Sequence, residues 1–265
     1  MSTKPTSLRD LLRATEPVIC CAMGQLRDPK LVEMVARSGN YQAIWFDQEH
    51  AGWTSKDIED GTRAARASGI HTFVRLPVTD YSAAMRPLEA GADGIMASMV
   101  RSADEVANLV RWSRFHPEGL RGVNGTGVDG NYGAYGGADY FAAANKKTMV
   151  AAQVECVEAL EDVERMAAVP GLDMLFIGPA DLSQSLGIPG QWDHSQMREA
   201  TQRVAKAAKK HGVAWGILPR DPDHAAFALQ NGCNLLSLGM DVWFFQQGLR
   251  AYWSTWKELV SKTRS

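Results

Sequence analysis

The sequence predicts a single α/β domain with the (β/α)8 architecture, a TIM barrel of eight parallel strands surrounded by helices. Its 265 residues fit such barrels, which typically have about 250 residues. Short apolar runs alternate with segments of helical spacing eight times along the chain, which favours parallel strands joined by crossover helices. Five predicted helices also end in glycine just before the next apolar run, a common helix-ending position. These glycines are Gly39, Gly69, Gly91, Gly212 and Gly232.

Local signals mark the starts of the helices in the first half of the chain. Asp28 followed by Pro29 indicates an N-cap with proline at the first helical position. Thr54 and Asp57 have the spacing of a capping box. Pro87 falls inside a predicted helix, where it predicts a kink or a late start. The predicted strands are 17–24, 41–46, 71–74 and 93–99, and the helices are 28–38, 54–68, 80–90 and 102–114.

Residues 117–139 interrupt this alternation. The stretch contains eight glycines, and a long irregular loop of this kind in a compact domain is usually a functional lid or disordered. Strands and helices alternate again beyond it. The predicted strands are 148–154, 174–177, 213–218 and 233–238, and the helices are 140–144, 159–168, 195–210, 222–230 and 242–262.

An open, doubly wound sheet is the alternative to a closed barrel. Eight strand–helix units in this length favour the barrel. The chain also lacks a GxGxxG motif after its first strand, which weakens the open-sheet interpretation. We therefore expect one barrel domain over residues 1–265.

Composition argues against several classes of function. A net charge of −2 provides no broad basic field for nucleic acid. No apolar run approaches the roughly 18 residues of a membrane span, and the N-terminal region shows no signal-peptide pattern. Without a CxxC pair, the cysteines are expected to be reduced and packed in a cytoplasmic protein. They are Cys20, Cys21, Cys156 and Cys233.

Five polar residues follow four of the strands, at the ends where barrel active sites lie. Each has an ordinary structural explanation: Asp181 could be a helix N-cap, and the others could be caps or surface charges. Their convergence on one rim favours a shared site. These residues are Glu49, His50, Arg75, Glu155 and Asp181.

This set of residue types suits chemistry that passes through an enolate. Glu155 and Asp181 are two hard oxygen donors, as Mg²⁺ or Mn²⁺ prefers when water and substrate complete the coordination. Arg75 is a fixed cation for a carboxylate, enolate or keto oxygen. His50 has an unperturbed pKa near neutrality and is the natural proton carrier.

A Schiff-base mechanism is disfavoured by the positions of the lysines. Such a mechanism needs a desolvated lysine at the barrel mouth. The ten lysines fall in predicted helices, in the tails or at the start of a strand. Lys56 alone lies near the rim, in the capped start of a helix, so a metal-dependent route is preferred.

Several motifs together resemble the HpcH/HpaI aldolases, the metal-dependent (class II) pyruvate aldolases typified by 4-hydroxy-2-oxo-heptane-1,7-dioate aldolase. The resemblance extends over residues 18–241 and includes the five motifs in one order. It implies a (β/α)8 barrel with a divalent metal, Mg²⁺, Mn²⁺ or Co²⁺. The motifs are Phe46-Asp47-Gln48-Glu49-His50, Val74-Arg75-Leu76-Pro77, Arg121-Gly122, Gln153-Val154-Glu155 and Phe176-Ile177-Gly178-Pro179-Ala180-Asp181-Leu182-Ser183.

The resemblance assigns metal and substrate contacts. It implies that Glu155 and Asp181 bind the metal, which the keto and carboxylate oxygens of pyruvate chelate. Arg75 would hold the keto or enolate oxygen, and Gln153 would line the pocket. Backbone N–H groups of the segment Gly178, Pro179, Ala180 and Asp181 would receive the substrate carboxylate.

The resemblance also assigns the proton-transfer residues. His50 would act as the base on the substrate hydroxyl, directly or through water. Asp47 and Glu49 would support His50 and the metal's water ligands. Glu89 stands where the family has an aspartate that pairs with the histidine across a subunit interface.

The family further implies a homohexamer, a trimer of dimers. Its C-terminal helix, here residues 242–265, would pack on a neighbouring subunit. The large apolar residues of this helix need a covering surface, although packing on its own barrel is the alternative. They are Trp243, Phe244, Phe245, Leu249, Trp253 and Trp256.

The expected function is that of a carbon–carbon lyase. It would reversibly cleave a 4-hydroxy-2-oxo acid into pyruvate, or a close 2-oxo acid, and an aldehyde. The alternatives are an acyl-CoA lyase of the citrate-lyase β-like branch and a barrel that binds a 2-oxo acid without catalysis. The first would need a basic trough for CoA phosphates, and the second would not need His50.

Overall fold

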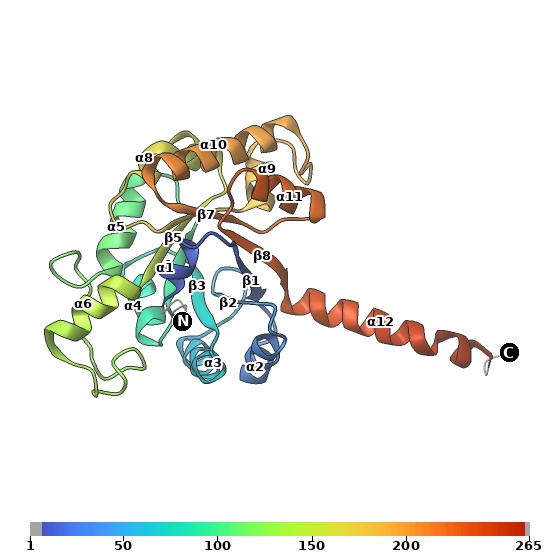
Figure 1. Cartoon of the computed structure of the whole chain (residues 1–265), viewed down its shortest axis with the longest axis horizontal. Coiled ribbons are helices and arrows are strands. Elements are labelled where there is room, and N and C mark those ends of the chain that lie inside the picture. Colours follow the sequence, from blue (N-terminus) through green and yellow to red (C-terminus); the bar gives the residue numbers. More distant parts are fainter. Residues whose placement is uncertain (1–6, 263–265) are drawn as a thin grey trace.

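The chain folds into a closed barrel of eight parallel strands in sequence order, and β1 pairs with both β2 and β8 (Figure 1). The computed structural model describes residues 7–262. The closed barrel confirms the predicted fold class, and the open-sheet alternative is wrong. The strands are β1 Val18–Met23, β2 Ala43–Asp47, β3 His71–Pro77, β4 Gly94–Ser98, β5 Met149–Val154, β6 Met174–Ile177, β7 Ala214–Ile217 and β8 Leu235–Met240.

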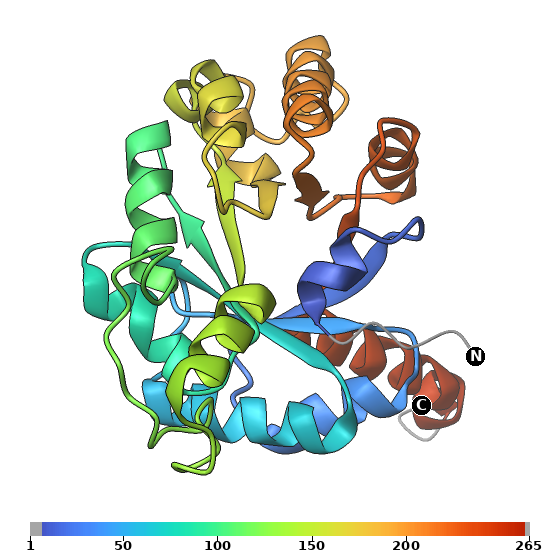
Figure 2. The ribbon, with the colours of Figure 1, turned by 60° about the vertical axis from the view of Figure 1, so that its left-hand side comes forward.

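Helices surround the strands, and local capping explains where several begin and end (Figure 2). The predicted capping box is present, because Thr54 and Asp57 each accept the other's backbone N–H. All five helix-ending glycines have positive φ, between 68° and 96°, a conformation that glycine adopts without steric cost. The helices are α1 Leu8–Leu12, α2 Pro29–Arg37, α3 Ser55–Ser68, α4 Tyr81–Glu89, α5 Ala103–Ser113, α6 Gly137–Lys147, α7 Val157–Glu161, α8 Val163–Ala167, α9 Pro179–Ser185, α10 Ser195–His211, α11 Pro222–Gln230 and α12 Asp241–Lys262.

Three local predictions differ from the structure. The predicted helix 159–168 is two short helices, α7 and α8, which meet at Asp162. Helix α4 begins at Tyr81, without the late start predicted from Pro87, and Pro87 lies inside it. Asp181 is not an N-cap, because α9 is capped by Gly178 and Asp181 lies in its first turn. The carboxylate of Asp181 is therefore not used in capping.

Helix α1 covers the end of the barrel from which the strands start. Leu8 and Leu12 are buried with the residues of the barrel interior. Arg9 forms an ion pair with Asp173, just before β6, with an Nε–Oδ1 distance of 2.6 Å. With this end covered, access to the interior residues is from the opposite end, the mouth.

The glycine-rich segment follows the outer side of α4. At its near end, the Gly122 N–H donates to the Tyr81 hydroxyl at the start of α4. At its far end, the Asp129 N–H donates to the Glu89 carbonyl at the end of α4, at 3.4 Å, and Val128 is buried. The segment therefore packs along the flank of its own barrel.

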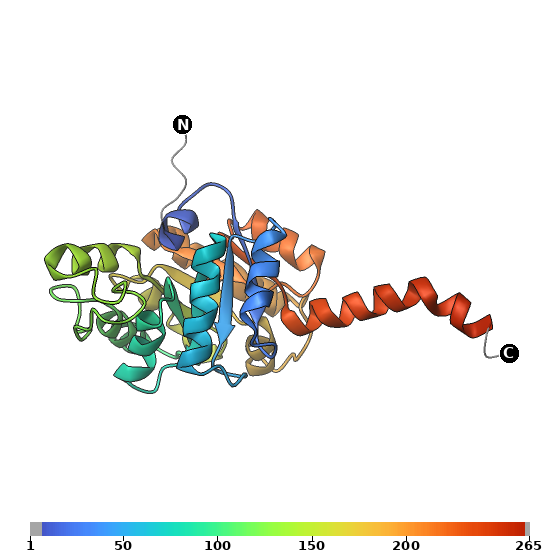
Figure 3. The same cartoon turned by 90° about the horizontal axis from the view of Figure 1, so that it is seen from below.

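Helix α12 extends away from the barrel as a long arm (Figures 1 and 3). Near its start, Phe244 lies beside Tyr41, with ring centroids 6.0 Å apart. Beyond that, the described part of α12 does not pack on its own barrel, because large apolar side chains remain exposed. They include Phe245 (58% exposed), Leu249 (52%), Tyr252 (70%), Trp253 (53%), Trp256 (43%) and Leu259 (60%). Residues 263–265 of the predicted helix lie outside the described part.

Two other predictions concern the chain as a whole. The four cysteines are free and buried, as expected for packed thiols. No helix among the described residues is both long and apolar enough to cross a membrane. Neither finding assigns a function. The residues that could carry one lie at the mouth of the barrel.

Candidate active site

The ends of four strands, β2, β3, β5 and β6, bring the predicted polar residues to the mouth. Asp47 ends β2, and Arg75 lies toward the end of β3. Glu155 follows β5 directly, and Asp181 lies in the first turn after β6. Because parallel strands all end on the same side of a barrel, residues distant in sequence meet here.

Arg75 is held by two carboxylates. Its Nε donates to Asp47 Oδ1 at 3.0 Å, and its Nη2 donates to Asp47 Oδ2 at 2.6 Å. Its Nη1 lies 3.1 Å from Glu49 Oε2, and the guanidinium stacks over Trp45, 4.8 Å from the ring centroid. Of the five N–H groups of an arginine, two bind Asp47, and three form no hydrogen bond with a described residue. The arrangement supports a fixed anion-binding role for Arg75.

Asp47 and Glu49 support His50 in different ways. Asp47 Oδ1 accepts the backbone N–H groups of Glu49 and His50, at 3.0 and 3.3 Å, so it orders the loop. Glu49 Oε2 lies 3.6 Å from His50 Nε2. The imidazole is 63% exposed, so it is accessible to solvent and can exchange protons with water.

Glu155 is buried at the mouth and is disfavoured as an anion. Burial, followed by the charges of Glu49 and Asp181, raises its pKa to about 7. The backbone N–H of Met99 opposes this shift by donating to Glu155 Oε1 at 2.5 Å. Met99 has φ of 55°, which is uncommon for a residue other than glycine.

Gly178 leaves the space in which Glu155 and Gln153 lie. A Cβ at this position would be 2.6 Å from Glu155 Oε2 and 3.2 Å from Gln153 Nε2. Gln153 is buried, and its Oε1 has no hydrogen-bond partner among the described residues. Gly178 and Pro179 are buried, whereas Ala180 is exposed and Asp181 half-buried. The segment predicted to receive a carboxylate therefore lies beside the buried glutamate.

The donors at the mouth fit a divalent cation. Among residues 7–262, no group of three or more His, Cys, Asp or Glu side chains is arranged to hold a metal. Glu155 and Asp181 nevertheless supply the one or two carboxylates that Mg²⁺ uses. A cation would relieve the charge repulsion that raises the pKa of Glu155. It would also suit the acceptor Gln153 Oε1, which lacks a partner.

Glu89 is the predicted site residue that the fold does not bring to the mouth. It is the last residue of α4, and α4 runs back toward the strand starts. Its prediction required a second subunit, so its pairing with His50 stays a prediction. Two contacts were missed from sequence, the Met99 N–H and the Trp45 ring beneath Arg75. A backbone N–H donor cannot be recognised from residue type, because every residue except proline has one. Trp45 lies in an apolar run that predicts only a buried strand.

A closed barrel with paired acids, a fixed arginine and a histidine at its mouth defines an enzyme of the class II aldolase type. The family model described as HpcH/HpaI aldolase/citrate lyase matches residues 24–247. The chain belongs to this family, as predicted from the sequence motifs. Metal dependence is typical of its members.

Individual relatives match over nearly their whole length. A hydroxypyruvate/pyruvate aldolase of Paraburkholderia phytofirmans is 33% identical over 94% of this chain and 97% of its own. A 5-keto-4-deoxy-D-glucarate aldolase of Klebsiella pneumoniae is 30% identical over 91% and 93%. Among solved structures, an HpcH/HpaI aldolase from Desulfitobacterium hafniense superposes with a TM-score of 0.87, at 29% identity over 96% and 98%.

Proposed function

We propose that this protein reversibly cleaves a 4-hydroxy-2-oxo acid into pyruvate, or a close 2-oxo acid, and an aldehyde. The observation that carries the proposal is the doubly held Arg75 beside the buried Glu155 and the exposed His50. Relatives named for pyruvate, hydroxypyruvate and a keto-deoxy sugar acid support this substrate class.

Glu155 and Asp181 hold the divalent metal, which acts as a Lewis acid toward the 2-oxo acid when bound. Arg75 directs N–H groups that Asp47 does not bind at the oxygen on which negative charge develops, and Asp47 keeps the guanidinium in place. Preorganised donors of this kind stabilise a transition state without reorganisation. The backbone N–H groups of Ala180 and Asp181 receive the substrate carboxylate.

His50 removes the proton from the C4 hydroxyl, directly or through water, as the C3–C4 bond breaks. The electron pair of that bond passes to the 2-oxo acid fragment, and the aldehyde leaves. Protonation of C3 then gives the 2-oxo acid. Glu49 Oε2 lies 3.6 Å from the imidazole Nε2 and holds the ring beside the mouth.

The active assembly is a homohexamer, a trimer of dimers, in a cytoplasmic enzyme. The arm α12 covers its apolar face on a neighbouring barrel. Glu89 pairs with a His50 across a subunit interface, which would also shield the exposed imidazole from water. Support comes from the row of exposed aromatic residues on α12.

The experiment is an assay of pyruvate release from a racemic 4-hydroxy-2-oxo acid. Wild type would be compared with chelator-treated protein, with protein re-supplied with Mg²⁺, Mn²⁺ or Co²⁺, and with Asp181→Ala. We expect activity to be lost on chelation, restored by metal and absent from the variant. Chelator-resistant cleavage would refute the metal assignment and direct attention to Lys56.

A matched control separates the proton carrier from the other histidines. His211 is the last residue of α10, at the end of the helix opposite the mouth, so His211→Gln should retain activity whereas His50→Gln should lose most of it. If both variants cleave the substrate equally well, His50 is not the base. Retained binding of a 2-oxo acid without turnover by wild type would favour the acyl-CoA lyase or the non-catalytic barrel.

A further inference from the structure

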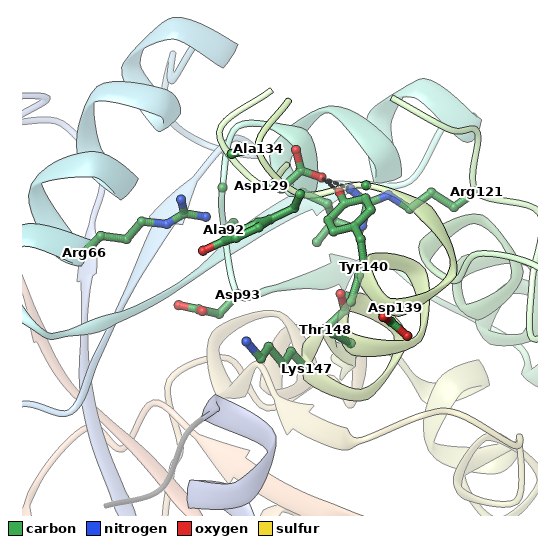
Figure 4. A pocket seen from close by; sticks show the side chains of 16 residues that line it. Arg66, Ala92, Asp93, Arg121, Asp129, Ala134, Asp139, Tyr140, Lys147 and Thr148 are labelled. Carbon is green, nitrogen blue, oxygen red and sulfur yellow. Dashed lines mark hydrogen bonds and ion pairs between the residues drawn. The ribbon is translucent and has the colours of Figure 1, made fainter. Parts of the chain in front are cut away.

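A second cavity lies on the flank of the barrel, near the end opposite the mouth (Figure 4). Its volume is about 780 Å³, within the range of small-molecule sites. It lies between the end of α3, the start of β4 and helix α6, so it contains none of the proposed catalytic residues. The mechanism above leaves it without a role.

One wall of this flank cavity is a closed polar network. Asp129 accepts Arg121 Nη2 and the Tyr140 hydroxyl, both at 2.6 Å, and the Gly130 N–H at 2.8 Å. Arg121 is 3% exposed and stacks over Phe115, with its Cζ 4.5 Å from the ring centroid. These contacts hold the wall together, and its half-buried acid is paired with Arg121.

The opposite side of the cavity carries charges that the protein does not neutralise fully. Arg66 donates from Nη1 to the Val128 carbonyl at 2.8 Å, a contact that fixes the guanidinium without cancelling its charge. Lys147 ends α6 and is exposed. Neither forms an ion pair with an acid among the described residues. Two cations whose charges no acid pairs favour an anion beside them, although Asp139, exposed in the first turn of α6, also lines the cavity.

Asp93 adds a third charge of opposite sign. Its Oδ2 accepts the Thr72 N–H at 2.8 Å and lies 3.4 Å from His71 Nδ1, which leaves Oδ1 available as an acceptor. Figure 4 shows the ends of Arg66, Asp93 and Lys147 around one space. A ligand there meets two cationic donors and one carboxylate acceptor.

We propose that the flank cavity binds a small organic acid that carries a hydroxyl or ammonium group beside its carboxylate. Arg66 and Lys147 receive the carboxylate, and Asp93 accepts the hydrogen bond of the neighbouring donor. A simple carboxylate lacks the second group and binds less tightly. This site is separate from the mouth, and the proposal does not rest on the proposed reaction.

The test is calorimetric titration of the full-length, metal-loaded protein with glycerate, serine and propionate. Glycerate and serine distinguish a hydroxyl from an ammonium donor, and propionate has neither. Because organic acids also bind at the mouth, Asp181→Ala is titrated in parallel. We expect glycerate or serine to bind this variant, and propionate to bind at least about tenfold more weakly.

Substitutions then locate the binding. Arg66→Gln and Lys147→Gln should each weaken binding to Asp181→Ala by about tenfold, and Asp93→Asn should reduce the preference over propionate. Arg63→Gln, an exposed arginine one turn earlier on α3, is the matched control and should change nothing. Melting temperatures verify folding. The proposal is overturned if Asp181→Ala binds neither acid, or if Arg66→Gln and Arg63→Gln bind equally well.

Discussion

Arg75 and Asp47 form two parallel hydrogen bonds across neighbouring strands, Nε to Oδ1 at 3.0 Å and Nη2 to Oδ2 at 2.6 Å. The two residues are register partners in the β2–β3 pairing. Their relative position is therefore fixed by the backbone ladder as well as by their charges. An arginine held in this way presents its free N–H groups in one direction, which a flexible lysine cannot reproduce.

Arg75→Lys should lower kcat for cleavage by about 100-fold, because the bidentate contact and the directed donors are lost. The charge is retained, so a simple electrostatic role would predict a much smaller effect. Steady-state pyruvate release and the melting temperature measure the two quantities. A kcat within threefold of wild type in a folded variant would contradict the proposed role.

Gly178→Ala should weaken metal binding by at least about tenfold, because the new Cβ would lie 2.6 Å from Glu155 Oε2. Titration calorimetry with Mn²⁺ measures the loss. Gly248→Ala in α12 is the matched control, since nothing lies within 4 Å of a Cβ there. The control should bind Mn²⁺ normally. Equal affinities for the two variants would show that Glu155 moves aside freely.

Metal affinity should rise with pH up to about 7, because Glu155 must lose its proton and its pKa is raised to about 7. Metal-free protein should show the opposite trend in stability. The native state holds this proton more tightly than the unfolded chain, so stability falls as pH rises from the ordinary glutamate range to about 7. Manganese titrations and urea unfolding between pH 5 and 8 test both trends, and Glu155→Gln should flatten the stability trend.

Trp253→Glu should prevent assembly of the proposed hexamer, because it places a charge in the exposed apolar row of α12. Size-exclusion chromatography with light scattering measures the mass. Ser254→Glu changes the adjacent exposed residue and should leave assembly intact. If wild type is already a monomer, α12 does not serve as an assembly arm.

The barrel could be predicted because its signals are local. Helix caps such as Thr54 with Asp57, and helix-ending glycines such as Gly69, depend on a few neighbouring residues. Which residues gather at the mouth could be predicted, since the strand ends of any such barrel converge there. Its detailed contacts could not, because the Met99 donor is a backbone group whose position depends on a turn after β4. The place of Glu89 relative to His50 depends on a second chain.

The backbone and the side chain of Met99, in the turn after β4, have different surroundings. The donor to Glu155 is a main-chain N–H, so the contact does not depend on the chemistry of the side chain at this position. The Met99 side chain is 46% exposed and forms no part of that contact. The surface of the rim at position 99 can therefore change, through residues that accept a φ of 55°, while the acid beneath keeps its partner.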